Sequence, residues 1–187
     1  MKIDYVNLLD FKTPVIFKDG TEVYEAFKKE YKVHKVGFFI LAPSGAGITY
    51  FINSQKKKKW IDGDELWVAT KAHPKFGWWL QGLNYIKEIC RRCDIVTEEA
   101  KKQGLWIMGS SSDVLRPDAV VIPDWRTHKK YIKARQEGNY DGGVTMEHFE
   151  ISKYHRNVLN GWVKKGVPKF KSVGDAANYL VNLVDKL

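Results

Sequence analysis

The sequence has little cysteine and no long apolar run, and each shortage excludes a class of protein. Its only cysteines are Cys90 and Cys93, which are too few for a disulfide-stapled scaffold and suit a reducing compartment. The longest apolar run extends from Val36 to Ala42, far short of the roughly 18–20 residues that span a bilayer. The first five residues contain no apolar stretch of the signal-peptide type. We therefore expect a cytoplasmic protein with no membrane partner.

Internal repeats, low-complexity tracts and linkers rich in proline or serine are also missing, which favours a single domain. The chain has 187 residues, of which 44% are hydrophobic and 28% are charged. This balance excludes a disordered chain, because enough apolar surface is present to offset the entropy of the ordered backbone. We expect an N-terminal extension over residues 1–35, followed by one domain over residues 36–187.

Acidic residues are fewer than basic ones: the chain has 22 Asp and Glu and 31 Lys and Arg, so its net charge is +9. Such a surplus favours an anionic partner, either a nucleotide, nucleic acid or an anionic surface. It is equally typical of a basic protein that is merely soluble. Charge alone does not choose between these interpretations.

Apolar runs of strand length alternate with segments of helical spacing along the domain. Strands are predicted at residues 36–42, 60–61, 105–108 and 119–122. Helices are predicted at residues 22–31, 49–55, 80–103, 127–136, 145–165 and 174–187, with a short strand or turn at Phe170. Buried strands that alternate with helices indicate an α/β fold, a three-layer sandwich whose mostly parallel sheet is covered on both faces. Ligands of such sheets bind at the carboxyl ends of the strands.

A glycine-rich turn follows the first strand and opens a helix, which is the context of a phosphate-binding P-loop. In the pattern Gly-x-x-x-x-Gly-Lys-Ser/Thr, Gly47 and Thr49 match, Ala42 replaces the first glycine and Ile48 replaces the lysine. The alternative is a turn that merely connects two elements. The candidate nucleotide-binding residues are Ser44, Gly45, Ala46, Gly47, Ile48 and Thr49.

Together with the segment from Trp60 to Asp64 and the order of the later elements, this loop resembles the P-loop kinases of the nucleoside-monophosphate-kinase-like group. Asp62-Gly63-Asp64 resembles the Asp-Gly-Asp of adenylylsulfate kinases, and polynucleotide 5′-kinases also have a carboxylate in this place. The resemblance implies ATP and Mg²⁺ as ligands. It implies that Asp62 and Asp64 orient an acceptor hydroxyl or hold the metal ion, with the Thr49 hydroxyl as a further metal ligand. The alternative interpretation of Asp-Gly is a β-turn.

Kinases of this group also have a lid that brings arginines over the phosphates. The resemblance places the lid at about residues 137–143 and gives Arg135 and Arg156 the role of catalytic clamps. For both arginines, a solvated basic helix face is the alternative.

Two departures from the family pattern predict that phosphoryl transfer is impaired. Ile48 offers no charge where the lysine would contact the phosphates, and no carboxylate closes the strand at residues 105–108. One hypothesis is therefore a weakened kinase that acts on a nucleoside, a nucleotide or a 5′-hydroxyl end. The other is a non-catalytic relative that binds nucleic acid or serves a protein assembly through its basic surface.

Three other features are interpreted as structural. The lysine run at 56–59 is typical of a solvated turn, and the two cysteines lie mid-helix without a second pair. Trp78 and Trp79 could stack on a base, but core packing is the favoured interpretation.

Overall fold

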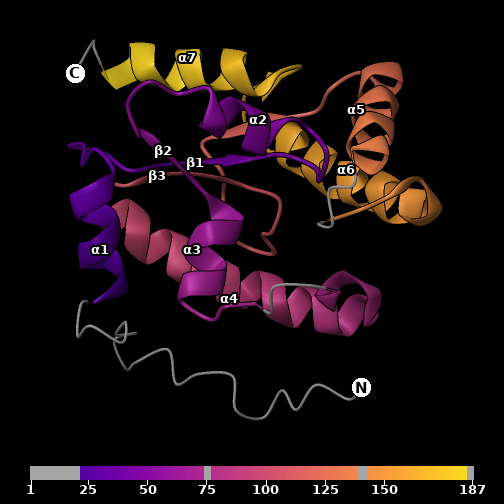
Figure 1. Cartoon of the computed structure of the whole chain (residues 1–187), viewed down its shortest axis with the longest axis horizontal. Helices are drawn as coiled ribbons and strands as arrows, with labels where there is room; N and C mark the ends of the chain where they lie inside the picture. The colour runs from indigo at the N-terminus through magenta and orange to yellow at the C-terminus, as the bar shows by residue number, and fades with distance from the viewer. Residues whose placement is uncertain (1–21, 74–76, 139–142, 185–187) are drawn as a thin grey trace.

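The computed structural model describes residues 22–73, 77–138 and 143–184, and these form an α/β structure around one parallel sheet (Figure 1). The five strands lie in the order β2-β3-β1-β4-β5, and every neighbouring pair is parallel. Their bounds are β1 Phe38–Leu41, β2 Trp60–Asp62, β3 Trp106–Gly109, β4 Ala119–Val121 and β5 Lys169–Phe170. The predicted α/β class and the predicted parallel sheet are confirmed.

Helices cover both faces of the sheet and make three layers (Figure 1). Residues alternate between the faces along each strand, so that Phe39 and Leu41 pack on one side and Phe38 and Ile40 on the other. The first face is covered by helices α1, α3, α4 and α6, and the second by α2 and α7. The described residues form the α-helices α1 Val23–Glu30, α2 Ile48–Asn53, α3 Gly63–Ala69, α4 Leu83–Lys102, α5 Trp125–Glu137, α6 Phe149–Lys164 and α7 Val173–Val184.

Helix α3 is absent from the sequence prediction, which treated residues 62–64 only as the end of a strand or a turn. Asp62 is the N-cap of this helix, because its Oδ1 accepts the N–H of Asp64 at 3.1 Å. The helix predicted over 80–103 begins later, as α4 at Leu83, because Leu80 is the last residue of a short 3₁₀ turn, η2 Trp78–Leu80. Helix α5 begins earlier than predicted because Asp124 caps it through the N–H of Thr127 at 2.9 Å.

Part of the predicted N-terminal extension belongs to the core of the domain. Val23 and Phe27 of α1, and Tyr31 directly after it, are buried beneath the sheet with residues of α3 and α4. Residues 1–21 lie outside the described part of the chain. Across the described ranges, no helix combines the length and hydropathy that a bilayer crossing requires.

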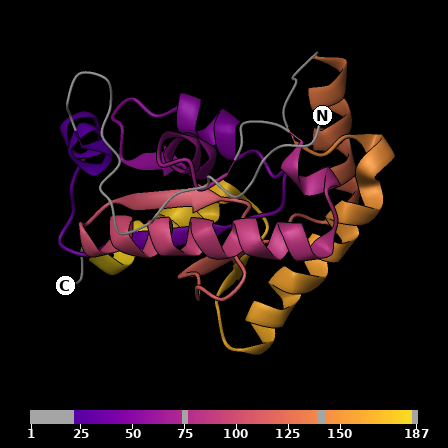
Figure 2. The same cartoon turned by 90° about the horizontal axis from the view of Figure 1, so that it is seen from below.

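The strand order creates a natural place for a ligand at the carboxyl edge of the sheet. The chain leaves β1 toward β2 on one side, and it leaves neighbouring β4 toward β5 on the other. Where two adjacent strands diverge in this way, the loops that follow them open a crevice. Helix α5 lies beyond one end of the sheet, while α4 runs along its face (Figure 2). The site is therefore expected where α5 meets the loop after β1.

Candidate functional site

The loop between β1 and α2 turns through two glycines in the left-handed region. Gly45 has a φ of 83° and Gly47 a φ of 93°, conformations that residues with a Cβ rarely adopt. The N–H of Ala46 donates to the Pro43 carbonyl at 3.0 Å. Among the described residues, no acceptor pairs with the N–H groups of Gly47, Ile48 and Thr49. The loop thus offers several adjacent donors that an anion could accept.

Helix α5 holds this loop from the opposite side. The ring of buried His128 lies 2.8 Å from the Ser44 carbonyl, measured from Nε2. Arg135 donates to Ser44 Oγ at 3.3 Å and to the carbonyl of Val144. Ile132 packs so closely on Gly45 that a Cβ there would lie 2.8 Å from Ile132 Cγ1. Three residues on one face of α5 therefore hold the loop between β1 and α2 in place.

Arg156, on α6, supports the loop indirectly through His128. A carbonyl can only accept a hydrogen bond, so His128 Nε2 carries the proton that it shares with Ser44. Its Nδ1 is then an acceptor, and the Arg156 guanidinium donates to it at 3.2 Å and to the Pro123 carbonyl at 2.8 Å. Burial lowers the pKa of His128, which favours this neutral ring.

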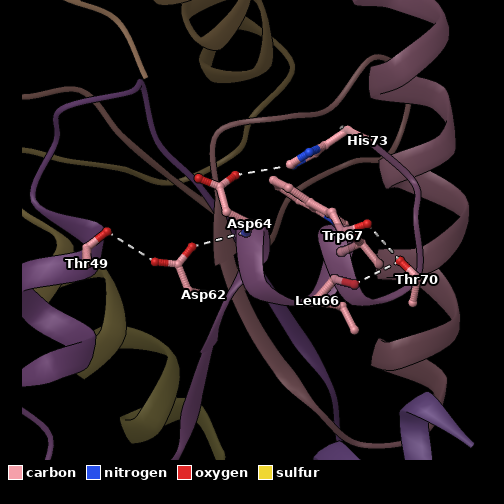
Figure 3. A network of polar contacts seen from close by, with 8 residues as sticks. Thr49, Asp62, Asp64, Leu66, Trp67, Thr70 and His73 are labelled. Atoms are coloured by element: carbon pink, nitrogen blue, oxygen red, sulfur yellow. Dashed lines mark hydrogen bonds and ion pairs between the residues drawn. The ribbon is translucent and has the colours of Figure 1, made fainter. Parts of the chain in front are cut away.

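Asp62 joins the two elements that follow β1 and β2 (Figure 3). Its Oδ2 accepts the Thr49 hydroxyl at 3.2 Å, while its Oδ1 caps α3. Burial and the neighbouring Asp64 carboxylate raise the pKa of Asp62 to about 6. The pairing of Thr49 with Asp62 brings together the two residues that the sequence suggested as metal ligands.

The oxygen atoms of Thr49 and Asp62 are of the type that binds a magnesium ion. A hydroxyl and a carboxylate are hard oxygen ligands, and Mg²⁺ usually takes one or two carboxylates and completes its shell with water and substrate phosphates. The described residues contain no group of three or more His, Cys, Asp or Glu side chains arranged to hold a metal ion. Any ion held by Thr49 and Asp62 would therefore need phosphate oxygens as well.

Asp64 points away from Asp62 and toward a buried histidine. Its Oδ1 lies 3.4 Å from His73 Nε2, and Figure 3 shows both side chains beside Trp67. The His73 ring stacks on Trp78, with ring centroids 5.3 Å apart. Since aromatic rings enclose His73 on two sides, the Asp64 carboxylate has a fixed neighbour rather than a mobile one.

A cavity of about 610 Å³ extends from the loop between β1 and α2 to this aromatic region. Ser44, Gly45, Ile48 and Thr49 line one end of it, and Arg135 and Asp64 also line it. Ile48 thus presents its apolar side chain where a P-loop lysine would face the phosphates. Asp62 and Arg156 are not among the described residues that line the cavity. The structure places Arg156 behind His128, and its contact with phosphates, which the resemblance implies, stays a prediction.

The end of β3 lacks a carboxylate for a structural reason. Gly109 closes this strand, and a Cβ there would lie 2.2 Å from Cη2 of the Trp67 ring. The Trp67 indole is held in this position because its Nε1 donates to the buried Thr97 hydroxyl at 2.9 Å. A strand-ending aspartate therefore has no room, and the carboxylate that the Thr49 hydroxyl contacts is Asp62 at the end of β2.

No family model, curated protein or solved structure matches the chain. The function must consequently be argued from the geometry of the site itself.

The lysine run and the cysteine pair border the site, since Lys58 lines a second pocket beside Thr49 and Asp62, and Cys90 lines the cavity. In the lysine run, Lys58 pairs with Glu30 and lies over the Tyr31 ring, 5.4 Å from its centroid, so it ties α1 to the domain. Burial raises the pKa of Cys90 to about 12, which leaves its thiol protonated. Of the lid predicted at 137–143, residues 139–142 lie outside the described part of the chain.

His73 and His128 are the residues of the site that sequence reasoning did not select. The signal for His128 was its spacing, because positions 128, 132 and 135 fall on one face of a helix. No comparable signal marks His73, since it follows α3 in an irregular segment. Its contact with Asp64 depends on how Trp67 and Trp78 pack around it.

Proposed function

We propose that this protein is a P-loop kinase-like protein that binds ATP at the loop of residues 42–49. The observation that carries the proposal is the set of amides at Gly47, Ile48 and Thr49 that have no acceptor among the described residues. They lie at the end of the cavity that Thr49 lines, and the Thr49 hydroxyl donates to Asp62. Backbone amides in this arrangement bind phosphate oxygens, and their binding does not require a lysine. Mg²⁺ would be held by the Thr49 hydroxyl and the Asp62 carboxylate and would neutralise phosphate charge.

Asp64 is the residue that could serve an acceptor in phosphoryl transfer. Its carboxylate lines the cavity and lies beside His73. In the proposed reaction, the acceptor oxygen forms a bond to the γ-phosphorus while the bond to the β,γ-bridging oxygen breaks, and Asp64 accepts the hydroxyl proton. Arg135 borders the same cavity and can donate to transferring oxygens.

Ile48 limits this reaction in the chain as it stands. Phosphoryl transfer depends chiefly on charge placed where the transition state develops it. An apolar side chain faces the phosphate end, and Lys58 of the nearby lysine run is engaged with Glu30. We therefore propose an ATP-binding protein whose phosphoryl transfer is slow.

Calorimetric titration with ATP, in the presence and absence of Mg²⁺, tests the proposal. The expected result is saturable binding that Mg²⁺ strengthens, with most of this gain lost in Asp62→Asn. Asp175→Asn, in helix α7 on the other face of the sheet from α3, is the matched control and should keep the gain. Absence of binding at millimolar ATP would contradict the proposal.

A second candidate function, nucleic-acid binding, is favoured by one observation on α5. Four exposed cations, Arg126, Lys129, Lys130 and Lys133, recur at the spacing of a single helical face. Such a row of cations can follow a phosphate backbone. The logarithm of the binding constant should then fall linearly with the logarithm of the salt concentration. Titration of single-stranded and duplex oligonucleotides at low salt tests this candidate, and no binding there would contradict it.

A further inference from the structure

We infer that the end of the cavity away from the phosphate loop takes an uncharged acceptor that carries a hydroxyl group and a planar ring, as a nucleoside does. This inference rests on the proposed function and narrows it, because a nucleotide or a 5′-hydroxyl nucleic-acid end is then disfavoured. Three properties of the cavity wall support it: an aromatic surface, the signs of the charges, and a buried hydroxyl without a partner.

The aromatic surface is formed by Trp78 and Trp79 of η2 together with His73. Trp79 is half-buried and lines the cavity, and its ring meets that of Trp78 edge to face, with centroids 5.9 Å apart. Trp78 is buried and stacks on His73. Trp78 therefore belongs to the core, as the sequence interpretation held, while Trp79 offers the surface on which a planar ring can stack.

Apolar side chains complete this part of the wall. Val68 and Ala69 of α3 face the cavity together with Ile86 of α4. A flat ring bound here would exchange water for apolar and aromatic contacts, which is typical of small-molecule sites. The volume of about 610 Å³ lies within the usual range for such sites.

The charges at this end of the cavity oppose a phosphorylated acceptor. The described lining residues include three carboxylates, Asp64, Glu65 and Asp113, and one ammonium group, that of Lys87. Burial lowers the pKa of His155 to about 4, so this lining residue adds no positive charge at neutral pH. A phosphate group placed among these carboxylates would be repelled, as like charges are at other binding surfaces.

The neighbouring arginines do not reverse this balance. Arg91 pairs with Asp113 at 2.9 Å and is not among the lining residues. Arg135 lies at the phosphate end, where it donates to Ser44 and Val144. The described cations thus leave the acceptor end with an excess of negative charge, in contrast to the basic surplus of the whole chain.

A buried hydroxyl provides the polar contact that such an acceptor needs. Ser111 follows β3, lines the cavity and is 1% exposed, and its Oγ has no partner among the described residues. A buried polar group without a partner costs free energy. A hydroxyl of the acceptor could pair with Ser111 while a second one faces Asp64.

Binding of thymidine, cytidine, adenosine and guanosine, each compared with its own 5′-monophosphate, tests the inference by calorimetry at saturating ATP. At least one nucleoside should bind, and bind at least about tenfold more tightly than its monophosphate. Trp79→Ala should weaken this binding by roughly tenfold, whereas Tyr179→Ala, on the opposite face of the sheet, should not. Glu65→Gln should reduce the preference for the uncharged form.

The outcomes separate this inference from the proposed function. If ATP binds but no nucleoside does, or if a monophosphate binds as tightly as its nucleoside, the inference is wrong and the proposed function stands. If Trp79→Ala remains folded by circular dichroism and binds normally, the assigned stacking surface is wrong. If ATP itself does not bind to the phosphate loop, the proposed function fails and the acceptor role fails with it.

Discussion

Substitution of Ile48 by lysine should tighten ATP binding. The Ile48 side chain is half-buried, lines the phosphate end of the cavity and packs in part on the cluster beneath α2 and α7. A lysine stem can follow the same apolar surface while its ammonium group extends into the cavity. The variant would thus place a cation where the phosphate loop now has none.

The magnitude follows from the contacts that the ammonium group would gain. A hydrogen bond to a charged partner contributes about 1.5–3 kcal/mol, which corresponds to a roughly 10–150-fold lower Kd for ATP. Loss of the half-buried isoleucine surface costs on the order of 1 kcal/mol of folding stability. If phosphoryl transfer also uses this donor, its rate should rise by roughly 10²–10³.

Two control variants isolate the effect of charge at this position. Ile48→Met supplies a long apolar stem without charge, and it should bind ATP as the unsubstituted chain does. Tyr50→Lys adds the same charge on the same helix at a side chain that is 84% exposed. It should change the Kd for ATP less than about twofold, because salt screens exposed charges.

Calorimetry with the four proteins, followed by ATP turnover with a panel of acceptors, decides the matter. An equal gain in Tyr50→Lys would show that the effect of the added charge is non-specific. A folded Ile48→Lys variant with unchanged ATP affinity would refute the assignment of this loop to the phosphates. Rapid turnover by the unsubstituted chain would refute the claim that Ile48 impairs transfer.

Three further predictions concern the supports of the site. Because the pKa of Asp62 is raised to about 6, the folded chain retains a proton that the unfolded chain releases between about pH 4 and 6. The free energy of unfolding of the unsubstituted chain, measured in urea and compared with that of Asp62→Asn, should therefore fall by about 1–2 kcal/mol as the pH rises from 4 to 7. A difference that does not change with pH would contradict the raised pKa. Arg156→Met removes the donor to His128 Nδ1, so it should cost about 1–3 kcal/mol of stability and weaken ATP binding; unchanged ATP affinity would refute the positioning role. Asp94→Ala should cost about 3 kcal/mol in urea unfolding, since Asp94 Oδ2 accepts the N–H groups of residues 113–115, and a loss below about 1 kcal/mol would contradict that account.

The layers of the fold could be predicted from the sequence because burial on both faces leaves a clear pattern. Runs such as Val36 to Ala42 are nearly continuous in apolar residues, as central parallel strands require. The order of the strands could not be predicted in the same way. It depends on which apolar surfaces meet after the chain folds, as where Phe38 of β1 pairs with Trp106 of β3, and sequence periodicity does not encode this choice.

Helix α3 had a signal that the sequence reasoning overlooked. Asp62 is followed three residues later by Glu65, the spacing of a capping box. The Asp-Gly pair directly follows an apolar strand pattern and is also typical of a turn, so the sequence prediction places a strand end or a turn there. In the structure the same aspartate both ends β2 and caps α3.

The candidate site was predictable where it depends on the carboxyl edge of the sheet. Thr49 and Asp62 follow parallel strands, so their meeting at one edge follows from the fold class. The place of Arg156 was not predictable, because it depends on the angle at which α6 packs and on the ring of His128 between them. Spacing along the chain contains no information on that angle.

Backbone amide shifts during an ATP–Mg²⁺ titration test the central claim most directly. In a ¹⁵N-labelled sample of the unsubstituted chain, the amide signals of Gly45, Gly47, Ile48 and Thr49 should shift together and saturate. Inorganic triphosphate should move the same signals, because the proposed contacts join the N–H groups of the loop to phosphate oxygens. If these signals stay unmoved at millimolar ATP, or if only the exposed cations of α5 respond, this loop is not a phosphate-binding site.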